Sequence, residues 1–272
     1  MADKIILLTH EYPPIRGGAG VYCYELANAA SALGSEIEVV APQGSTLHAR
    51  PKLRELTWKG SQSWISSFRL LFFIRKFYNR KDEKFLLHAA DMGVCKAFIR
   101  FGFLLPSQNR IMVTIHGSEL LKFTRNPIER FFFHCFLQKC ETIHVLSKFN
   151  YENCSKFCIP AIPKLKLTRG APSRVVNNVT EQNRKDQDPE VLKILCVGRI
   201  HPRKGQLLLL QAASVLPAEI QSNIQFIFVG PIKDKRYHQE VLSLSHKFSG
   251  KIQFKGDISE TKLSAYYSSS HI

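Results

Sequence analysis

Two cations flank a turn in the second half of the chain. Arg199 and Lys204 follow the apolar run Val191 to Val197 and precede a stretch with helical character, Gln206 to Leu216. This order predicts a buried parallel strand that turns into a helix, at the edge where open α/β sheets bind ligands. Arginine presents a planar fork to phosphate, and lysine adds a mobile charge beside a helix N-terminus that favours anions. The segment therefore predicts a site for a phosphorylated ligand, with a solvated basic loop as the alternative.

A glycine-rich segment near the N-terminus is the second candidate site. Gly17, Gly18 and Gly20 follow a predicted strand over residues 5–9 and two prolines, and they precede a predicted helix. Glycines let the main chain approach a ligand closely, and a turn that opens a helix can bind an anion. Cys23 stands where a dinucleotide fingerprint needs its third glycine, which argues against a nicotinamide site. A tight structural loop is the alternative.

A histidine and a carboxylate form the third candidate site. The predicted strand Arg110 to Ile115 ends in His116, and Glu119 follows after a flexible glycine. Polar side chains at the carboxyl end of a parallel strand are placed for proton transfer or for hydrogen bonding to a ligand. The alternative is a structural histidine, which is the more frequent role of a single histidine.

These candidate sites lie in a chain that alternates between strand and helix patterns. Such alternation is typical of α/β folds, in which helices flank parallel sheets. The predicted strands cover residues 5–9, 36–41, 84–89, 110–115, 141–146, 191–197, 224–229 and 252–255. Helices are predicted over residues 21–33, 92–101, 206–216, 237–248 and 260–268, and Ser147 is predicted to cap a further helix. Residues 42–63 are predicted to be irregular.

Prolines and polar residues interrupt the alternation between residues 159 and 189. Such a stretch is typical of a linker between domains. We therefore predict an N-terminal domain over residues 1–170, a linker over 171–190 and a second domain over 191–272.

Residues 64–84 are aromatic, apolar and basic. On a helix, Arg69, Lys76 and Arg80 fall near one line, with apolar residues over most of the remaining surface. Two interpretations stay open. The segment is either a core helix with one solvated basic edge, or a helix on an anionic membrane with its cations at the head groups.

The net charge of +16 at pH 7 is concentrated in the first part of the chain. Residues 1–185 carry 27 Lys and Arg against 14 Asp and Glu, whereas residues 186–272 carry 11 against 8. This excess predicts an anionic partner: a membrane, a nucleic acid or a phosphorylated substrate. A nucleic-acid binder accounts for the charge but for none of the motifs at strand ends, so no nucleic-acid partner is expected.

Seven cysteines are scattered without a CxxC pair. Cys135, Cys140, Cys154 and Cys158 match no common zinc spacing, so reduced thiols and no metal are predicted.

The N-terminus has no signal-peptide pattern, and no apolar run has the length of a membrane span. A cytoplasmic location is therefore expected.

The three candidate sites together resemble a known family. The motifs stand in family order over nearly the whole chain: Glu11-Tyr12-Pro13-Pro14 with Gly17-Gly18-Ala19-Gly20, His116-Gly117-Ser118-Glu119, Val145-Leu146-Ser147, and Val197-Gly198-Arg199 with Lys204-Gly205. The chain is similar to GT-B nucleotide-sugar glycosyltransferases of the large retaining family four, also called group 1. This resemblance implies two Rossmann-like domains.

The resemblance also implies roles for the candidate residues. Arg199 and Lys204 would neutralise the diphosphate of the donor, and the Gly17 to Gly20 segment would close on that diphosphate. His116 would lie near the donor sugar, with Glu119 as a further donor or acceptor contact. Transfer would retain anomeric configuration through a front-face mechanism without a covalent enzyme intermediate. The catalysis would then consist of positioning and leaving-group electrostatics.

The implied partners are a nucleotide-sugar and an acceptor that is a glycan, a lipid or a small molecule. No cofactor and no metal are implied. Polysaccharide biosynthesis is the expected setting. Because residues 64–84 fit a helix on an anionic membrane, peripheral contact with the inner face of such a membrane stays an open interpretation beside a cytoplasmic location.

One departure from the family concerns the end of the sequence. Members carry two glutamates, seven residues apart, after a strand that would begin near His271, and this sequence stops before them. We therefore expect a truncated member whose second domain is incomplete. The alternative function is a truncated or degenerate homologue without catalysis that binds an anionic surface or a partner protein.

Overall fold

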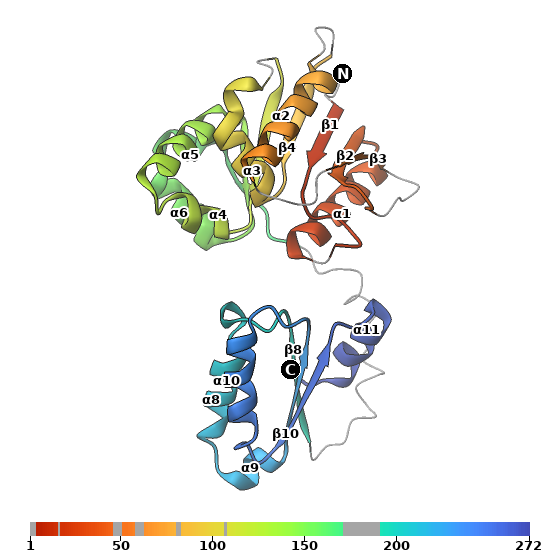
Figure 1. The fold of residues 1–272 in the computed structure, drawn as a ribbon, viewed down its shortest axis with the longest axis vertical. Helices are drawn as coiled ribbons and strands as arrows, with labels where there is room; N and C mark the ends of the chain where they lie inside the picture. Colours follow the sequence, from red (N-terminus) through yellow and green to blue (C-terminus); the bar gives the residue numbers. More distant parts are fainter. Residues whose placement is uncertain are drawn as a thin grey trace. The chain divides into compact units, whose positions relative to one another are not determined.

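The computed structural model describes residues 4–15, 17–45, 51–57, 63–79, 83–105, 108–170 and 191–272. The chain forms two compact units, Met1–Ala171 and Pro172–Ile272, and each combines a parallel sheet with helices (Figure 1). The α/β fold class with two such sheets is therefore confirmed. The predicted linker over residues 171–190 lies outside the described residues.

The sheet of the first unit has seven parallel strands in the order β3-β2-β1-β4-β5-β6-β7. The strands are β1 (Lys4–Leu8), β2 (Ile37–Pro42), β3 (Lys52–Leu56), β4 (Phe85–Ala89), β5 (Arg110–Ile115), β6 (Thr142–Val145) and β7 (Leu165–Leu167). Because all strands run in one direction, the carboxyl ends of β1, β4 and β5 meet at one edge.

Helices pack on both faces of this sheet. They are α1 (Gly18–Ala32), α2 (Trp64–Tyr78), α3 (Met92–Phe101), α4 (Ser118–Phe123), α5 (Pro127–Lys139) and α6 (Lys148–Phe157), with the short 3₁₀ segments η1 (Gly102–Leu104) and η2 (Ile159–Lys164). Alternate strand residues contribute to two buried clusters. One cluster joins α1 to β1 and β2, and the other joins α2, α3, α5 and α6 to the central strands.

Polar side chains fix where several helices begin. Ser147 accepts a hydrogen bond from the amide of Asn150 at 3.2 Å, as the sequence predicted. Ser63 accepts one from Ser66 at the start of α2, and Asn126 accepts two at the start of α5. Each bond satisfies an amide that the helix itself leaves unpaired.

Three predictions about elements were wrong. The stretch from 42 to 63 contains the strand β3, whose alternating polar residues suit the edge of a sheet and gave no apolar run. The interrupted stretch that begins at residue 159 still contains η2 and the strand β7, which ends at Leu167. The helix predicted over 64–84 ends at Tyr78, and Arg80 lies outside the described residues.

The second unit has a three-stranded parallel sheet in the order β10-β9-β8. Its elements are β8 (Leu192–Val197), η4 (Pro202–Lys204), α8 (Gln206–Ser214), α9 (Ala218–Ser222), β9 (Ile224–Val229), α10 (Lys235–Ser245), β10 (Lys251–Gly256) and α11 (Glu260–Ser269). Phe226, Phe228 and Phe248 lie at its buried centre, between α8 and α10. His271 and Ile272 form main-chain hydrogen bonds with β8.

No helix in the described part of the chain is long and apolar enough to cross a membrane.

Candidate functional site

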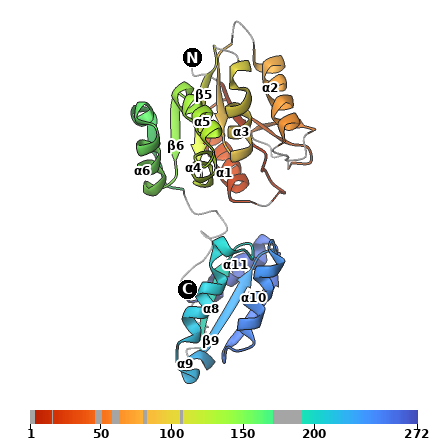
Figure 2. The same ribbon diagram turned by 60° about the vertical axis from the view of Figure 1, so that its left-hand side comes forward.

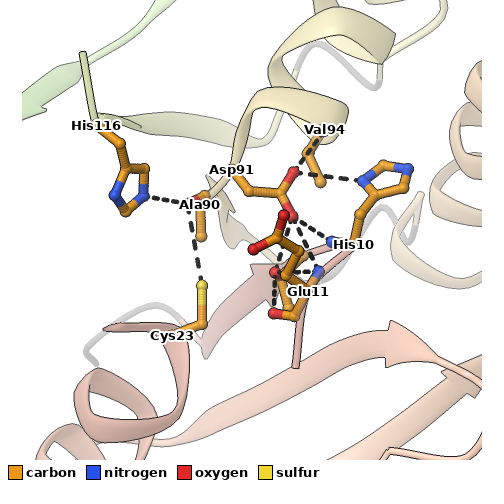
Figure 3. Close-up of polar contacts among 8 residues, drawn as sticks. His10, Glu11, Cys23, Ala90, Asp91, Val94 and His116 are labelled. Carbon is orange, nitrogen blue, oxygen red and sulfur yellow. Dashed lines mark hydrogen bonds and ion pairs between the residues drawn. The ribbon is translucent and has the colours of Figure 1, made fainter. Parts of the chain in front are cut away.

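Asp91 is the centre of the polar edge of the first unit, at the carboxyl end of β4. Figure 3 shows its carboxylate between the residues after β1 and the first turn of α3. One oxygen accepts a hydrogen bond from the amide of Val94 at 2.9 Å and so caps α3. The other accepts bonds from the Thr9 hydroxyl at 2.9 Å and from the amides of His10 and Glu11. The carboxylate therefore fastens the loop after β1 to α3.

The same carboxylate is paired with a buried histidine. The His10 ring nitrogen Nδ1 lies 3.3 Å from Asp91, and both side chains are almost fully buried. Burial alone would raise the pKa of Asp91, but hydrogen bonds and charge from His10, with the Val94 and His10 amides, lower it to about 2. Gly93 makes room for this pair, because a side chain there would clash with the His10 ring. Asp91 is therefore ionised at neutral pH.

His116 is held by the residue next to Asp91. Its Nε2 lies 2.8 Å from the carbonyl oxygen of Ala90 (Figure 3). Because a carbonyl only accepts, this bond requires a proton on Nε2, and in the neutral ring Nδ1 is then the acceptor. The Tyr22 ring of α1 packs edge-on against the His116 ring, with centroids 5.1 Å apart. The predicted histidine thus has a fixed orientation between β4 and α1.

The three glycines have different roles from the predicted loop. Gly17 is the N-cap of α1, and Gly18 and Gly20 lie inside its first turn, so the prediction of a turn that ends before a helix at Val21 was wrong for these two. A side chain on Gly17 would displace the flexible end of the Glu11 side chain. A Cβ on Gly20 would lie 3.1 Å from the Glu11 carbonyl, whereas Gly18 faces open space. Glycine therefore lets α1 begin directly against the loop that Asp91 holds.

Behind His116, a row of polar side chains links β4, β5 and β6 to α1. Thr114 lies 2.7 Å from His88 and 3.3 Å from His144, and the Tyr22 hydroxyl lies 3.0 Å from His144. Burial, together with His144 and His116, lowers the pKa of His88 to about 3. Both His88 and His144, whose pKa is also lowered by burial, are therefore neutral at pH 7.

The cationic turn of the second unit is built on glycine. Gly198 has φ 157 and follows β8, and Gly205 has φ 72 at the start of α8. Lys204 ends the 3₁₀ segment η4, and its alkyl chain lies along Gly198, where a Cβ would meet it at 3.3 Å. The Arg199 carbonyl accepts a hydrogen bond from the buried Gln206 at 3.1 Å. Both cations are exposed, and within the described residues neither forms an ion pair.

Glycines also end the two neighbouring strands. Gly230 follows β9 with φ 141, and Gly256 ends β10 with φ 61. The Gly230 amide donates to the Gly256 carbonyl at 2.7 Å, and a side chain on Gly230 would clash with the Gly198 carbonyl. The carboxyl edge of this sheet is therefore a surface of close main-chain groups with Lys204 and Arg199 beside it.

Two predicted features remain predictions. Arg199 and Lys204 belong to the second unit and the Gly17 to Gly20 segment to the first, so their shared cleft is not placed. Glu119 lies in α4, and its side chain is outside the described part of the chain. Among the described residues no group of His, Cys, Asp or Glu is arranged to hold a metal ion.

Comparison with known families decides the identity of the chain. The family model described as Glycosyltransferase Family 4 matches residues 16–163, which is more than half of the sequence. The chain belongs to glycosyltransferase family 4. A second model, Glycosyl transferases group 1, matches residues 178–272. The prediction of a nucleotide-sugar-dependent glycosyltransferase is confirmed at the level of the family.

Solved structures give the fold of this family 4 glycosyltransferase. A crystal structure of HepE from Anabaena, in complex with UDP and glucose, matches with a TM-score of 0.64 at 14% identity, over 95% of this chain and 70% of that one. WaaG, a glycosyltransferase involved in lipopolysaccharide biosynthesis, matches with a TM-score of 0.67 at 12% identity, over 98% of this chain and 73% of that one. Trehalose-phosphate synthase from Burkholderia xenovorans matches with 0.68 at 13% identity, over 98% and 78%. The GT-B fold is therefore confirmed. A comparison with curated protein sequences gives no match.

Two residues that hold the polar edge of the first unit had not been singled out from the sequence. Asp91 was not singled out, although an acid that follows a strand and precedes a glycine signals a helix cap at a sheet edge. Tyr22 was counted only as a helix residue. Its contact with His116 depends on two segments 94 residues apart, and no local pattern marks it.

Proposed function

We propose that this glycosyltransferase transfers a sugar from a nucleotide-diphosphate sugar to a glycan, lipid or small-molecule acceptor with retention of configuration. The observation that carries the proposal is the cationic turn of the second unit. Arg199 and Lys204 are exposed beside three strands that end at glycines, which carry no side chain to keep a diphosphate from the main chain. The HepE structure with UDP and glucose supports this class of donor.

Arg199 and Lys204 act on the leaving group in this proposal. When the bond between sugar and diphosphate breaks, negative charge grows on the phosphate oxygen. Arginine donates two parallel hydrogen bonds to such oxygens, and lysine adds a charge. Stabilisation that increases in the transition state accelerates the reaction, whereas equal stabilisation of bound donor does not.

His116 positions the donor sugar in this proposal. Its Nε2 proton is committed to the Ala90 carbonyl, so Nδ1 accepts a hydrogen bond from a sugar hydroxyl. Neither a metal nor a cofactor takes part, and no covalent enzyme intermediate forms. The anomeric carbon is instead held close to the acceptor on the same face as the leaving diphosphate.

Turnover with a panel of nucleotide-sugars tests the proposal. We expect one donor to be consumed, with the product's anomeric configuration retained by NMR. Arg199→Gln and Lys204→Gln should each lower kcat about 100-fold or more, the usual loss when one charge-stabilising donor is removed. Lys247→Gln, beyond the end of α10 at the opposite edge of the sheet, is the matched control and should leave kcat unchanged. Equal loss in all three variants would contradict the assigned roles.

The alternative function is a homologue without catalysis that binds an anionic surface or a partner protein. The exposed aromatic and basic side chains of α2 favour it. Binding of nucleoside diphosphates without consumption of any donor would support this alternative. Peripheral contact with the inner face of an anionic membrane fits either function. The transferase would meet a lipid-linked acceptor there, and the homologue without catalysis would bind the anionic surface itself.

A further inference from the structure

Helix α2 exposes aromatic side chains on the face opposite its core contacts. Leu70, Leu71 and Ile74 are fully buried against the sheet. On the outer face, Trp64 is 62% exposed, and Phe68 and Phe72 follow at four-residue spacing with exposures of 50% and 62%. Side chains at this spacing form a continuous stripe along a helix. The helix is therefore apolar on two faces, one of which stays half-exposed or more within the described residues.

The stripe continues onto α3 and α5. Trp64 and Phe68 both pack edge-on against Phe101, with centroids 5.7 and 5.8 Å apart, and Phe101 neighbours the exposed Phe103. Phe103 in turn lines an apolar groove with residues of α5, among them the exposed Phe131. In both ribbon views α3 lies between α2 and α5 (Figures 1 and 2). We call this region, from Trp64 to Phe131, the aromatic surface.

Basic side chains border the aromatic surface. Helices α2 and α3 carry Arg69, Arg75, Lys76, Lys96 and Arg100, and neither helix contains an Asp or Glu. Arg69 and Lys76 are exposed and lie seven residues apart, so both stand on one edge of the stripe. The Arg100 guanidinium lies 4.2 Å from the Trp64 ring on another side, and Lys139 borders the groove. Burial, followed by repulsion from Arg100 and Lys122, lowers the pKa of Lys96.

We propose that the aromatic surface docks on an anionic lipid bilayer. Exposed rings at the head-group level, with cations around them, form the arrangement that binds the interface of a membrane. Lipid chains take up the rings, and anionic head groups neutralise the surrounding cations. This inference deepens the membrane contact proposed above and names the elements that make it. The surface includes η1 and α5, which lie outside the segment of residues 64–84.

Vesicle sedimentation of the full chain without donor tests the electrostatic part. The wild type should bind vesicles of phosphatidylcholine mixed with phosphatidylglycerol. It should not bind vesicles of pure phosphatidylcholine. The double variant Arg69→Gln/Lys76→Gln should lower the partition coefficient about 25-fold, since each cation at an anionic surface contributes about five-fold. The matched control, Lys235→Gln/Lys247→Gln on the second unit, should retain wild-type binding. Equal binding to both vesicles, or equal loss in both double variants, would overturn the proposal.

The apolar part has its own variants. Phe72→Ser and Phe131→Ser change exposed side chains, so both proteins should fold, and each should bind anionic vesicles several-fold more weakly. Leu208→Ser, at a residue of α8 that is 69% exposed, is the control in the second unit. Binding that is unchanged in both phenylalanine variants would overturn the docking role of the aromatic surface.

Fluorescence distinguishes a bilayer from a protein partner. The chain has two tryptophans, and Trp58→Phe leaves Trp64 as the reporter. Its emission should shift to shorter wavelength with anionic vesicles and be quenched by brominated lipid. A shift that depends on protein concentration without lipid would mean that a second copy covers the surface, against the proposal. These binding experiments contain no donor, so an absence of vesicle binding would not contradict the sugar-transfer proposal. Conversely, a protein that binds vesicles but transfers no sugar would contradict sugar transfer and not the docking of the aromatic surface.

Discussion

At the scale of single residues, Asp91 connects the loop after β1 to the first turn of α3. It accepts hydrogen bonds from two elements that are about 80 residues apart in sequence, and it stays ionised while buried. A buried charge is tolerated only when hydrogen bonds replace the lost water. Its partners are therefore as important as the carboxylate.

Asp91→Asn should destabilise the first unit by about 2 kcal/mol at neutral pH, the free energy that corresponds to its lowered pKa. The pKa falls from 3.8 to about 2, so the stabilisation is present above pH 4 and is lost as pH falls toward 2. The difference between wild type and variant should therefore shrink below pH 4. Urea unfolding followed by tryptophan fluorescence measures it, since both tryptophans, at 58 and 64, belong to this unit.

Ser147→Ala is the matched control for this experiment. It removes the cap of α6, which should cost about 1 kcal/mol, but without a titrating group. Its effect should be the same at every pH from 7 to 3. A pH-independent loss in Asp91→Asn as well would show that the aspartate acts as a neutral cap and not as an ion.

At the scale of elements, the contact of α1 with the loop after β1 decides which glycine is needed. Gly20→Ala should destabilise the first unit by about 1–3 kcal/mol, because its Cβ would press on the Glu11 carbonyl. Gly18→Ala, two residues earlier, meets open space and should be neutral or stabilising by up to about 1 kcal/mol. Thermal unfolding of the pair measures the difference, and equal effects would contradict this packing.

Sequence patterns predicted the elements that have long apolar runs. They missed elements that are held by contacts with other parts of the fold. The turn at Gly198 could be predicted from the sequence, because the strand, the glycine and the cations are consecutive. The strand β3 was not, because it alternates polar and apolar residues and is held by an ion pair between Arg54 and the buried Glu38 of β2 at 2.6 Å. The exposure of Phe68 and Phe72 was also unreadable, since an apolar helix residue packs equally well inward or outward.

At the scale of the whole molecule, each unit has its own buried core and should unfold in its own transition. A bound nucleoside diphosphate should raise the transition of the second unit, where Arg199 and Lys204 lie. At a ligand concentration 100 times the Kd, the free energy of unfolding of this unit should rise by about 2.7 kcal/mol. Calorimetry beside tryptophan fluorescence separates the two units, because the fluorescence follows only the first. No shift with any nucleoside diphosphate would contradict the diphosphate site.

The cysteines give a practical route to the arrangement of the two units in solution. None of the seven forms a disulfide, and five are buried. The two that are partly accessible, Cys135 and Cys196, lie one in each unit. Burial raises the pKa of Cys196, so modification there should be slower than at an ordinary thiol. Paired spin labels or dyes at these two natural positions would report the distance between the units, with and without a bound donor, and no cysteine would have to be introduced.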